Sequence, residues 1–299
     1  MSALATPLGD ALGPRGRRRA AAATAVAAAG LAVLAVLAVN RLADRGQLAE
    51  RQWEPFTRES VIRFLLGGLG NTVRAAAMAM ALSIVVGALL ALVRLSRRAP
   101  LRWLAAAWIE FFRGVPLILL ILFTGLGLPK YGVDLPVYWY LVLALVAYNG
   151  AVFAEIFRAG IASLDRGQGE AAAALGLTYG QSMARVIVPQ AARRMVPAIV
   201  SQSVTLLKDT SLGFVIVYEE LLRRGRVTGE FFFNPLQSLA VVAGIYIVVN
   251  LAMSRLARRL EARQRRRYRA GSIDVGGIED LAVVGAQGRA AAAAGAGGL

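Results

Sequence analysis

Residues 170–189 read EAAAALGLTYGQSMARVIVP and lie between two of the most apolar parts of the chain. One carboxylate, Glu170, precedes four alanines, and glycines follow at Gly176 and Gly180. Alanine has high helix propensity, a negative charge is favourable at a helix amino terminus, and glycine commonly ends a helix. The stretch therefore predicts a short helix that begins near Glu170 and ends at Gly176 or Gly180. Pro189 marks a further interruption before the next apolar segment.

The alanines of this predicted helix suit a docking surface. Because Ala171 and Ala172 are small, another backbone or side chain can approach them closely. The alternative is a helical hairpin that only faces solvent, and periodicity does not distinguish the two.

Long uncharged runs flank this stretch on both sides. Runs of about 18 or more apolar residues are long enough to cross a bilayer as helices. The uncharged runs cover residues 20–39, 75–93, 114–129, 135–154 and 231–254. The third run reaches this length when residues 109–112 join it, and residues 195–218 form a further apolar segment. We therefore predict an all-α integral membrane protein with about six transmembrane helices.

The composition supports a membrane protein and excludes several kinds of chemistry. Hydrophobic residues make up 57% of the 299 residues and charged residues only 17%, against about 25% in soluble domains. Cysteine and histidine are absent, which excludes disulfides, thiol nucleophiles, imidazole bases and the usual zinc sites. Neither Lys130 nor Lys208 ends a GxxxxGK[ST] loop, so the chain has no Walker A site for ATP. We predict no catalytic, metal or cofactor-binding residues.

The net charge of +16 is distributed as in a membrane protein. With a cytoplasmic amino terminus, the inner segments hold 22 Arg and Lys residues and the outer segments hold 9. This is the positive-inside bias of membrane proteins, and it places both termini in the cytoplasm. It argues against nucleic-acid binding, which the pI near 11.3 would otherwise suggest.

The same pattern divides the chain into segments. We expect residues 1–19 to be a disordered cytoplasmic tail and residues 20–39 to be an additional first transmembrane helix. Residues 64–260 would form one membrane domain, which contains a cytoplasmic loop at about 158–194. The Gly- and Ala-rich residues 270–299 would form a second disordered cytoplasmic tail. A cleaved signal peptide is the alternative for the first helix, although its apolar run exceeds the usual 7–15 residues.

The spacing in residues 170–189 resembles the EAA–x3–G–x9–I–x–L–P signature of ABC importer permeases. Glu170, Ala171, Ala172, Gly176 and Pro189 match the signature, and valine occupies both aliphatic positions. Other segments resemble the polar amino acid branch of that family, which includes histidine, glutamine and glutamate permeases. These segments are residues 111–116 (FFRGVP), 148–151 (YNGA), 154–161 (AEIFRAGI) and 207–212 (LKDTSL). YNGA is similar to the variant in glutamate-type permeases.

This resemblance implies a type I ABC importer permease core and a bacterial cytoplasmic membrane location. The signature residues would form a coupling helix that docks on a dimer of ABC ATPase subunits, which would hold ATP and Mg. The other implied partners are a second permease subunit, identical or homologous, and an extracytoplasmic solute-binding protein, with membrane lipid around the helices. The substrate would be a polar amino acid, glutamate or a close relative.

Polar residues inside the predicted spans are candidates for the translocation pathway or its gate, since charges in a membrane are costly unless paired or facing a cavity. The candidates are Arg113, Asn149, Glu155, Lys208, Asp209 and Thr210. Lys208 and Asp209 are adjacent, so on a helix they point about 100° apart and meet different partners. A structural or gating network with Arg113 or Glu155 is favoured over direct contact of Lys208 with substrate.

Two other functions remain open at this point. A self-sufficient secondary transporter or channel would show inverted repeats and coupling charges in several helices. An intramembrane enzyme would need a clustered nucleophile and base, and the absence of His and Cys leaves few candidates.

Overall fold

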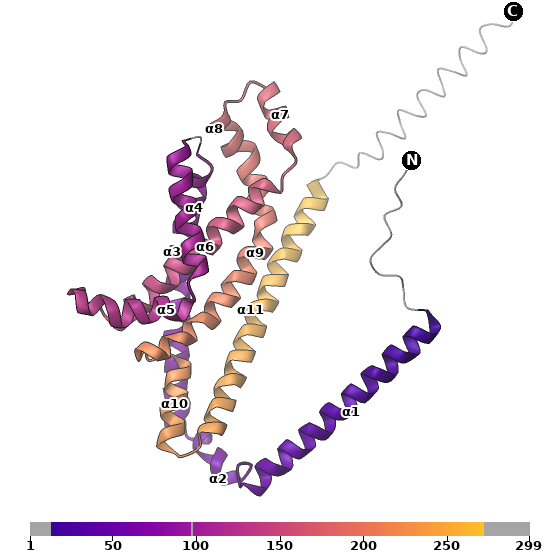
Figure 1. The fold of residues 1–299 in the computed structure, drawn as a ribbon, viewed down its shortest axis with the longest axis vertical. Coiled ribbons are helices and arrows are strands. Elements are labelled where there is room, and N and C mark those ends of the chain that lie inside the picture. The colour runs from indigo at the N-terminus through magenta and orange to yellow at the C-terminus, as the bar shows by residue number, and fades with distance from the viewer. Residues whose placement is uncertain (1–12, 97, 272–299) are drawn as a thin grey trace, which may run out of the picture. The chain divides into compact units, whose positions relative to one another are not determined.

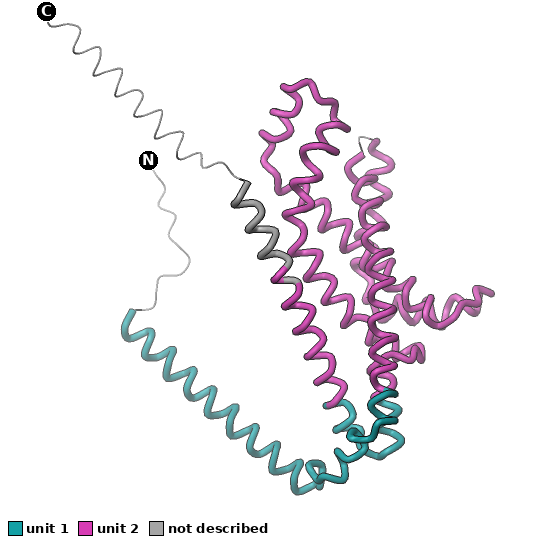
Figure 2. The backbone as a smooth tube through the Cα atoms, turned by 180° about the vertical axis from the view of Figure 1, so that it is seen from behind, with its two compact units in different colours: residues 1–64, 226–240 teal, residues 65–225, 241–299 magenta. Residues whose placement is uncertain are grey.

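The computed structural model describes residues 13–96 and 98–271, which form helices joined by short turns (Figure 1). The long helices are α1 (Pro14–Asp44), α3 (Glu59–Arg94), α4 (Ala99–Gly114), α6 (Val137–Ala162), α9 (Val188–Asp209), α10 (Leu221–Phe231) and α11 (Pro235–Gly271). The short helices are α2 (Glu50–Trp53), η1 (Glu54–Thr57), α5 (Leu117–Leu122), η2 (Phe123–Gly127), η3 (Leu128–Tyr131), α7 (Arg166–Ala174), α8 (Tyr179–Ser182), η4 (Met183–Ile187) and η5 (Thr210–Ile216). The chain divides into two compact units, coloured separately in Figure 2.

The first unit comprises the chain up to Phe64 together with residues 226–240. Its helix α1 contains the predicted first span, and none of the described residues of α1 is buried. Elsewhere in this unit, polar side chains at the start of α11 bind backbone carbonyls before α3. The Asn234 amide donates to the Gln52 carbonyl at 2.8 Å, and the Gln237 amide donates to the Gln47 carbonyl.

The second unit, residues 65–225 and 241–299, is built around α6. Helices α4, α5 and α9 pack against α6, so its side chains form the centre of the core. Leu141, Leu145 and Phe153 of this helix are fully buried. The near-continuous apolar sequence of α6 fits this position, because a helix surrounded on most sides by other helices has little polar surface.

Glycines allow α3 and α6 to approach closely. A Cβ atom at Gly87 would lie 2.6 Å from Phe153 Cβ and 3.0 Å from the Gly150 carbonyl oxygen. A Cβ atom at Gly150 would lie 2.9 Å from Val86 Cγ1. Small residues at helix crossings are typical of membrane bundles, where packing replaces the hydrophobic effect as the force between helices. Gly87 is therefore a packing position.

A sharp bend separates α4 from the helical segment that follows it. The two arms, Ala99–Gly114 and Leu117–Tyr131, meet at 97°. Val115 is extended, with ψ of 129°, because a residue before proline is disfavoured in the helical region. Pro116 then begins the next helix, so the Gly114–Val115–Pro116 sequence sets the bend.

A buried carboxylate and the residue after it join three helices. The Glu220 side chain is fully buried and accepts hydrogen bonds from the backbone N–H groups of Leu222 and Arg223 at the start of α10. The Tyr246 hydroxyl of α11 donates to the same carboxylate at 2.9 Å. The neighbouring Leu221 N–H donates to Thr72 Oγ1 of α3 at 3.1 Å. Glu220 thus ties the start of α10 to α11, and the adjacent Leu221 ties it to α3, roles that the sequence did not indicate.

Four described helices are long and apolar enough to cross a membrane, or five spans if the bent pair counts as one. They cover the predicted spans except residues 195–218, which correspond to α9 and η5. Helix α9 does not qualify because it carries Arg193, Arg194, Lys208 and Asp209 besides several amides and hydroxyls. The count of six spans stays a prediction.

The predicted segment boundaries also stay predictions. Residues 1–12 and 272–299, which make up most of the two predicted tails, lie outside the described residues. Helix α1 begins at Pro14, before the predicted start of the first span at residue 20.

The close crossing of α3 and α6 predicts opposite effects for two glycine substitutions in one helix. Gly87→Ala would force a methyl group into Phe153, and overpacking of this kind costs about 1–3 kcal/mol of unfolding free energy. Gly70→Ala is the matched control, since a Cβ atom there meets nothing within 4 Å and alanine favours the helix by about 1 kcal/mol. Thermal unfolding in detergent measures both variants, and equal melting temperatures would contradict this packing.

Candidate functional site

The sequence signature forms a short helix, α7, between α6 and α8. Its amino terminus is capped by Asp165, whose carboxylate accepts a hydrogen bond from the Gly167 N–H at 2.8 Å. Because α7 runs from Arg166 to Ala174, Glu170 lies in the middle of the helix. The prediction that Glu170 begins the helix was therefore wrong. The side chain of Glu170 is exposed.

Gly176 ends α7, as one of the two predicted stops. Its φ of +76° is a left-handed conformation that favours glycine. The Gly176 N–H donates to the Ala173 carbonyl and the Leu177 N–H donates to the Ala172 carbonyl, which is the Schellman pattern of a helix carboxy terminus. Ala171 remains exposed, whereas Ala172 is buried at 3% exposure. Of the two signature alanines, only Ala171 faces outward.

The chain then reaches α9 through the short helix α8, whose amino terminus is capped, and the π-helical segment η4. The Thr178 and Gln181 side chains form a reciprocal capping box at the start of α8. The π-helical η4 precedes Pro189, which stands in the first turn of α9. Proline has no N–H to donate to the preceding turn, so a wider helical turn at this point accommodates it.

Specific contacts attach α7 and its flanks to the beginning of α9. The Gln190 amide of α9 donates to Gln168 Oε1 of α7 at 3.0 Å. The Arg194 guanidinium donates to the Ser163 carbonyl at 2.6 Å, where α6 ends. Leu164 packs in one buried cluster with residues of α9. The loop is therefore bound to the first two turns of α9.

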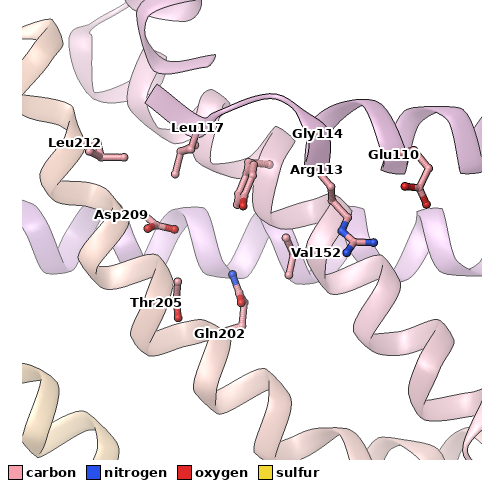
Figure 3. Close-up of a pocket in the computed structure, with 10 residues that line it drawn as sticks. Glu110, Arg113, Gly114, Leu117, Val152, Gln202, Thr205, Asp209 and Leu212 are labelled. Carbon is pink, nitrogen blue, oxygen red and sulfur yellow. The ribbon is translucent and has the colours of Figure 1, made fainter. Parts of the chain in front are cut away.

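A polar pocket of about 520 Å³ lies further along α9, between that helix and α4, α5, α6 and η5. Gln202, Thr205 and Asp209 project into it from one face of α9 (Figure 3). Arg113 and Glu110 enter from α4. Leu117, Val152 and Leu212 supply apolar wall, and the Tyr148 ring completes the lining.

The pocket carries both signs of charge. Arg113 contributes a guanidinium, while Asp209 and Glu110 contribute carboxylates. Among the described residues, no carboxylate lies within 4.0 Å of the Arg113 guanidinium, so the pocket retains a cation and an anion for a solute. Such a lining suits a small molecule that itself carries an ammonium and a carboxylate group.

Asn149 supports this pocket from behind. It is fully buried in α6, its amide donates to the Leu145 carbonyl at 3.0 Å, and its Oδ1 accepts from the Gln202 amide at 2.8 Å. The bond fixes Gln202 against α6. Asn149 therefore positions a lining residue without lining the pocket itself.

Glu155 belongs to an ion-pair network that shares Glu110 with the pocket lining. Its carboxylate pairs with Arg158 in the same helix, and the Arg94 guanidinium lies 3.8 Å from Glu155 and 3.9 Å from Glu110. This network connects the ends of α3, α4 and α6. The predicted network instead joined Glu155 or Arg113 to Lys208 and Asp209, and the ion pairs of the described residues do not include that pairing.

The three neighbouring candidates at the end of α9 have different environments. Asp209 lines the pocket, whereas Lys208 is exposed and does not line it. Thr210 is fully buried and donates to the Leu207 carbonyl at 2.7 Å, which closes the end of α9. The adjacent charges thus meet different surroundings, as their 100° separation on a helix requires.

Sequence reasoning missed Gln202, Thr205 and Arg94. A signal for the first two was present, because Gln202, Thr205 and Asp209 are spaced three and four residues apart and share one helix face. No such signal was present for Arg94, because its partners Glu110 and Glu155 lie on other helices.

The second unit is thus a helical bundle with a polar, two-signed pocket and an exposed helix on a connecting loop, an arrangement that suits a membrane transport subunit. The profile of the family described as "Binding-protein-dependent transport system inner membrane component" matches residues 83–266. This region extends from α3 to α11 and includes the pocket and the loop. The chain belongs to this family.

Individual relatives agree with the family. The glutamate transport system permease protein GluD of Corynebacterium glutamicum is 40% identical over 234 residues, which cover 77% of this chain and 84% of that protein. The probable glutamine ABC transporter permease protein GlnP of Bacillus subtilis is 39% identical over 209 residues, 68% of this chain and 94% of that protein. These relatives are permease subunits of ABC transporters, and this chain is such a transport subunit and not itself an enzyme.

Solved structures give the same fold. The crystal structure of an amino acid ABC transporter with histidines aligns with a TM-score of 0.65 and 32% identity, covering 68% of this chain and 94% of the other. An inward-facing form of the MetNI methionine ABC transporter aligns with a TM-score of 0.60 at 20% identity, which supports the fold alone. The type I importer permease fold predicted from the sequence is thereby confirmed.

The Asn149–Gln202 bond predicts a loss of stability when one partner is removed. Gln202→Ala would leave the buried Asn149 Oδ1 without its donor, at a cost of about 1–3 kcal/mol in unfolding free energy. Ser201→Ala, at an exposed position of the same helix, is the control. Replacing both Asn149 and Gln202 by leucine should cost less than the sum of the two single leucine changes. Strict additivity in this cycle, measured by thermal unfolding in detergent, would show that the bond contributes nothing.

Proposed function

We propose that this chain is the permease subunit of an ATP-driven importer for a polar amino acid, with α7 as its coupling helix. The observation that carries the proposal is the course of α9. One end of this helix is bonded to α7 and the other end lines the polar pocket. Its 22 residues correspond to about 33 Å of continuous helix, although Pro197 between the two ends removes one backbone hydrogen bond. A displacement of α7 would therefore reach the pocket through a single element.

The exposed surface of α7 supports docking of another protein. Leu175, directly after the helix, is 82% exposed, an unusual position for a large apolar side chain. Ala171 and Ala174 beside it leave room for a close approach, and Glu170 offers a charge. A partner with an apolar groove and a basic or amide group would cover all of these. We propose that this partner is a dimer of ABC ATPase subunits, which bind ATP and Mg.

The pocket supports an amino acid as the solute. In this proposal Arg113 attracts the carboxylate and Asp209 attracts the ammonium group, while Gln202 and Thr205 supply neutral hydrogen bonds. Relatives are named for glutamate, glutamine and arginine transport, so the substrate belongs to the polar amino acids. The name of the Corynebacterium relative supports glutamate. The lining itself has two carboxylates for one guanidinium and does not select for an acidic side chain.

The proposed assembly contains two permease subunits, identical or homologous, with an external solute-binding protein. The loop at residues 158–194 and both chain termini would face the bacterial cytoplasm, in agreement with the excess of Arg and Lys on that side. ATP-driven closure of the ATPase dimer would move α7, shift α9 against α6, and open the pocket alternately to each side.

Charge reversal at the coupling helix tests the ATPase assignment. Glu170→Lys should abolish both co-purification with the ATPase subunit and ATP-dependent uptake, because it places a cation opposite the basic or amide group that Glu170 meets. Glu230→Lys makes the same charge change at an exposed position of α10 and should leave both unchanged. Intact co-purification and uptake in Glu170→Lys would refute the coupling role. Uptake by the chain without any ATPase would instead favour a secondary transporter.

Substitutions in the pocket test the solute site independently of the coupling helix. Asp209→Asn or Arg113→Gln should reduce uptake about 10- to 100-fold, the range expected when one charge-assisted hydrogen bond is lost. Lys208→Gln should have no such effect, since Lys208 is exposed and lies outside the pocket. Uptake of labelled glutamate, glutamine and arginine into proteoliposomes is the measurement. Equal losses in Lys208→Gln and Asp209→Asn would contradict this assignment.

A further inference from the structure

An apolar groove of about 280 Å³ lies on another part of the second unit, where α3, α6 and α9 meet. Ala88, Ala91 and Leu92 line it from one face of α3, together with Leu95, which directly follows that helix. Phe157 and Ile161 line it from α6. Helix α9 contributes Val188, Ala192, Met195 and Ile199. The alanines create the space, because larger side chains at their positions would fill it.

The groove continues into a wider cavity of about 650 Å³. Leu92, Leu95 and Val188 line both, so the two form one channel. The wider part also contains Ser96 and Tyr179, which bring polar atoms to its lining. One end of the channel is therefore purely apolar and the other end is partly polar.

Basic residues flank the polar end. The backbone N–H of Arg98 donates to Oγ of the lining residue Ser96 at 3.2 Å, and Arg185 follows the lining residue Ala184 in the sequence. Both arginines adjoin the lining without belonging to it. Both arginines are exposed, and neither has a carboxylate of the described residues within 4.0 Å. The lining of both cavities contains no acidic residue. Two arginines with long, flexible side chains therefore adjoin this end, and they give its surroundings a positive charge.

The lining of the groove determines what can occupy it. All of its side chains are apolar, so the groove offers no partner to a polar group. A flexible hydrocarbon chain suits such a lining.

We propose that this channel binds one anionic phospholipid, with an acyl chain in the groove and the phosphate near Arg98 and Arg185. Basic pockets between transmembrane helices on the cytoplasmic side are known to hold anionic headgroups. The cytoplasmic position of the headgroup rests on the proposed orientation of loop 158–194. Because Tyr179 and Val188 border α8 and α9, the lipid would contact the segment that links the coupling helix to the pocket.

Native mass spectrometry of the purified full-length chain tests this proposal without an ATPase or an uptake assay, so its result is separate from the proposed function. The detergent-solubilised protein is incubated with phosphatidylglycerol or with phosphatidylcholine of identical acyl chains. We expect one phosphatidylglycerol to be retained at least about tenfold more strongly than phosphatidylcholine.

Two sets of variants locate the site. Arg98→Gln combined with Arg185→Gln should remove the preference for phosphatidylglycerol, whereas Arg41→Gln combined with Arg51→Gln removes the same charge elsewhere and should not. Ala192→Phe, which fills the groove, should abolish retention, and Ala198→Phe at an exposed position of the same helix should not. If Ala192→Phe fails to fold, the arginine variants still decide the matter.

Three outcomes would overturn the proposal. Equal retention of the two lipids would show that no anionic headgroup is recognised. Unchanged preference in the Arg98 and Arg185 double variant would place the lipid elsewhere. Because the natural chain has no cysteine, Ala192→Cys can also be tested for disulfide cross-linking, and efficient cross-linking between copies would assign the groove to a second copy.

Discussion

The attachment of α9 to its neighbours is the constraint on which the functional part of the structure depends. At one end Gln190 and Arg194 bind the loop that carries α7, and in the middle Gln202 is held by the buried Asn149. A polar pair inside a membrane bundle is stable only when both partners are satisfied. These contacts fix the orientation of α9. They thereby direct the side chains of Thr205 and Asp209 toward the pocket.

The remaining helices give α9 a firm support and a polar space beside it. The glycine crossing of α3 and α6 keeps α6 central, and the 97° bend after Gly114 separates α4 from α5. The bend leaves the Arg113 guanidinium at the end of a helix and close to the pocket. A continuous helix through Pro116 would have no such opening. Packing and pocket therefore arise from the same few backbone features.

The sequence allowed the membrane class, the importer permease fold and the helix that ends at Gly176 to be predicted, since these depend on local composition and spacing. It misplaced Glu170, because the cap is supplied by Asp165 five residues earlier. The ion pairs around Arg94 and the hydrogen bonds of the buried Glu220 carboxylate could not be predicted, since both sets of contacts join helices distant in sequence. The spacing of Gln202, Thr205 and Asp209 on one face of α9 could have been recognised from the sequence. The adjacent charges of Lys208 and Asp209 drew attention away from it.

The most direct test of the central claim is whether α9 moves against α6 when the ATPase acts. Cysteines introduced at the exposed positions Leu143 and Ser201 can be spin-labelled without background, because the chain has no cysteine of its own. Labelled chains diluted into unlabelled chains then report this one distance by electron–electron double resonance. The account predicts that adding ATP to the assembled complex shifts the distance distribution, and that Gln190→Ala reduces the shift. An unchanged distribution in a complex that transports its substrate would contradict the account.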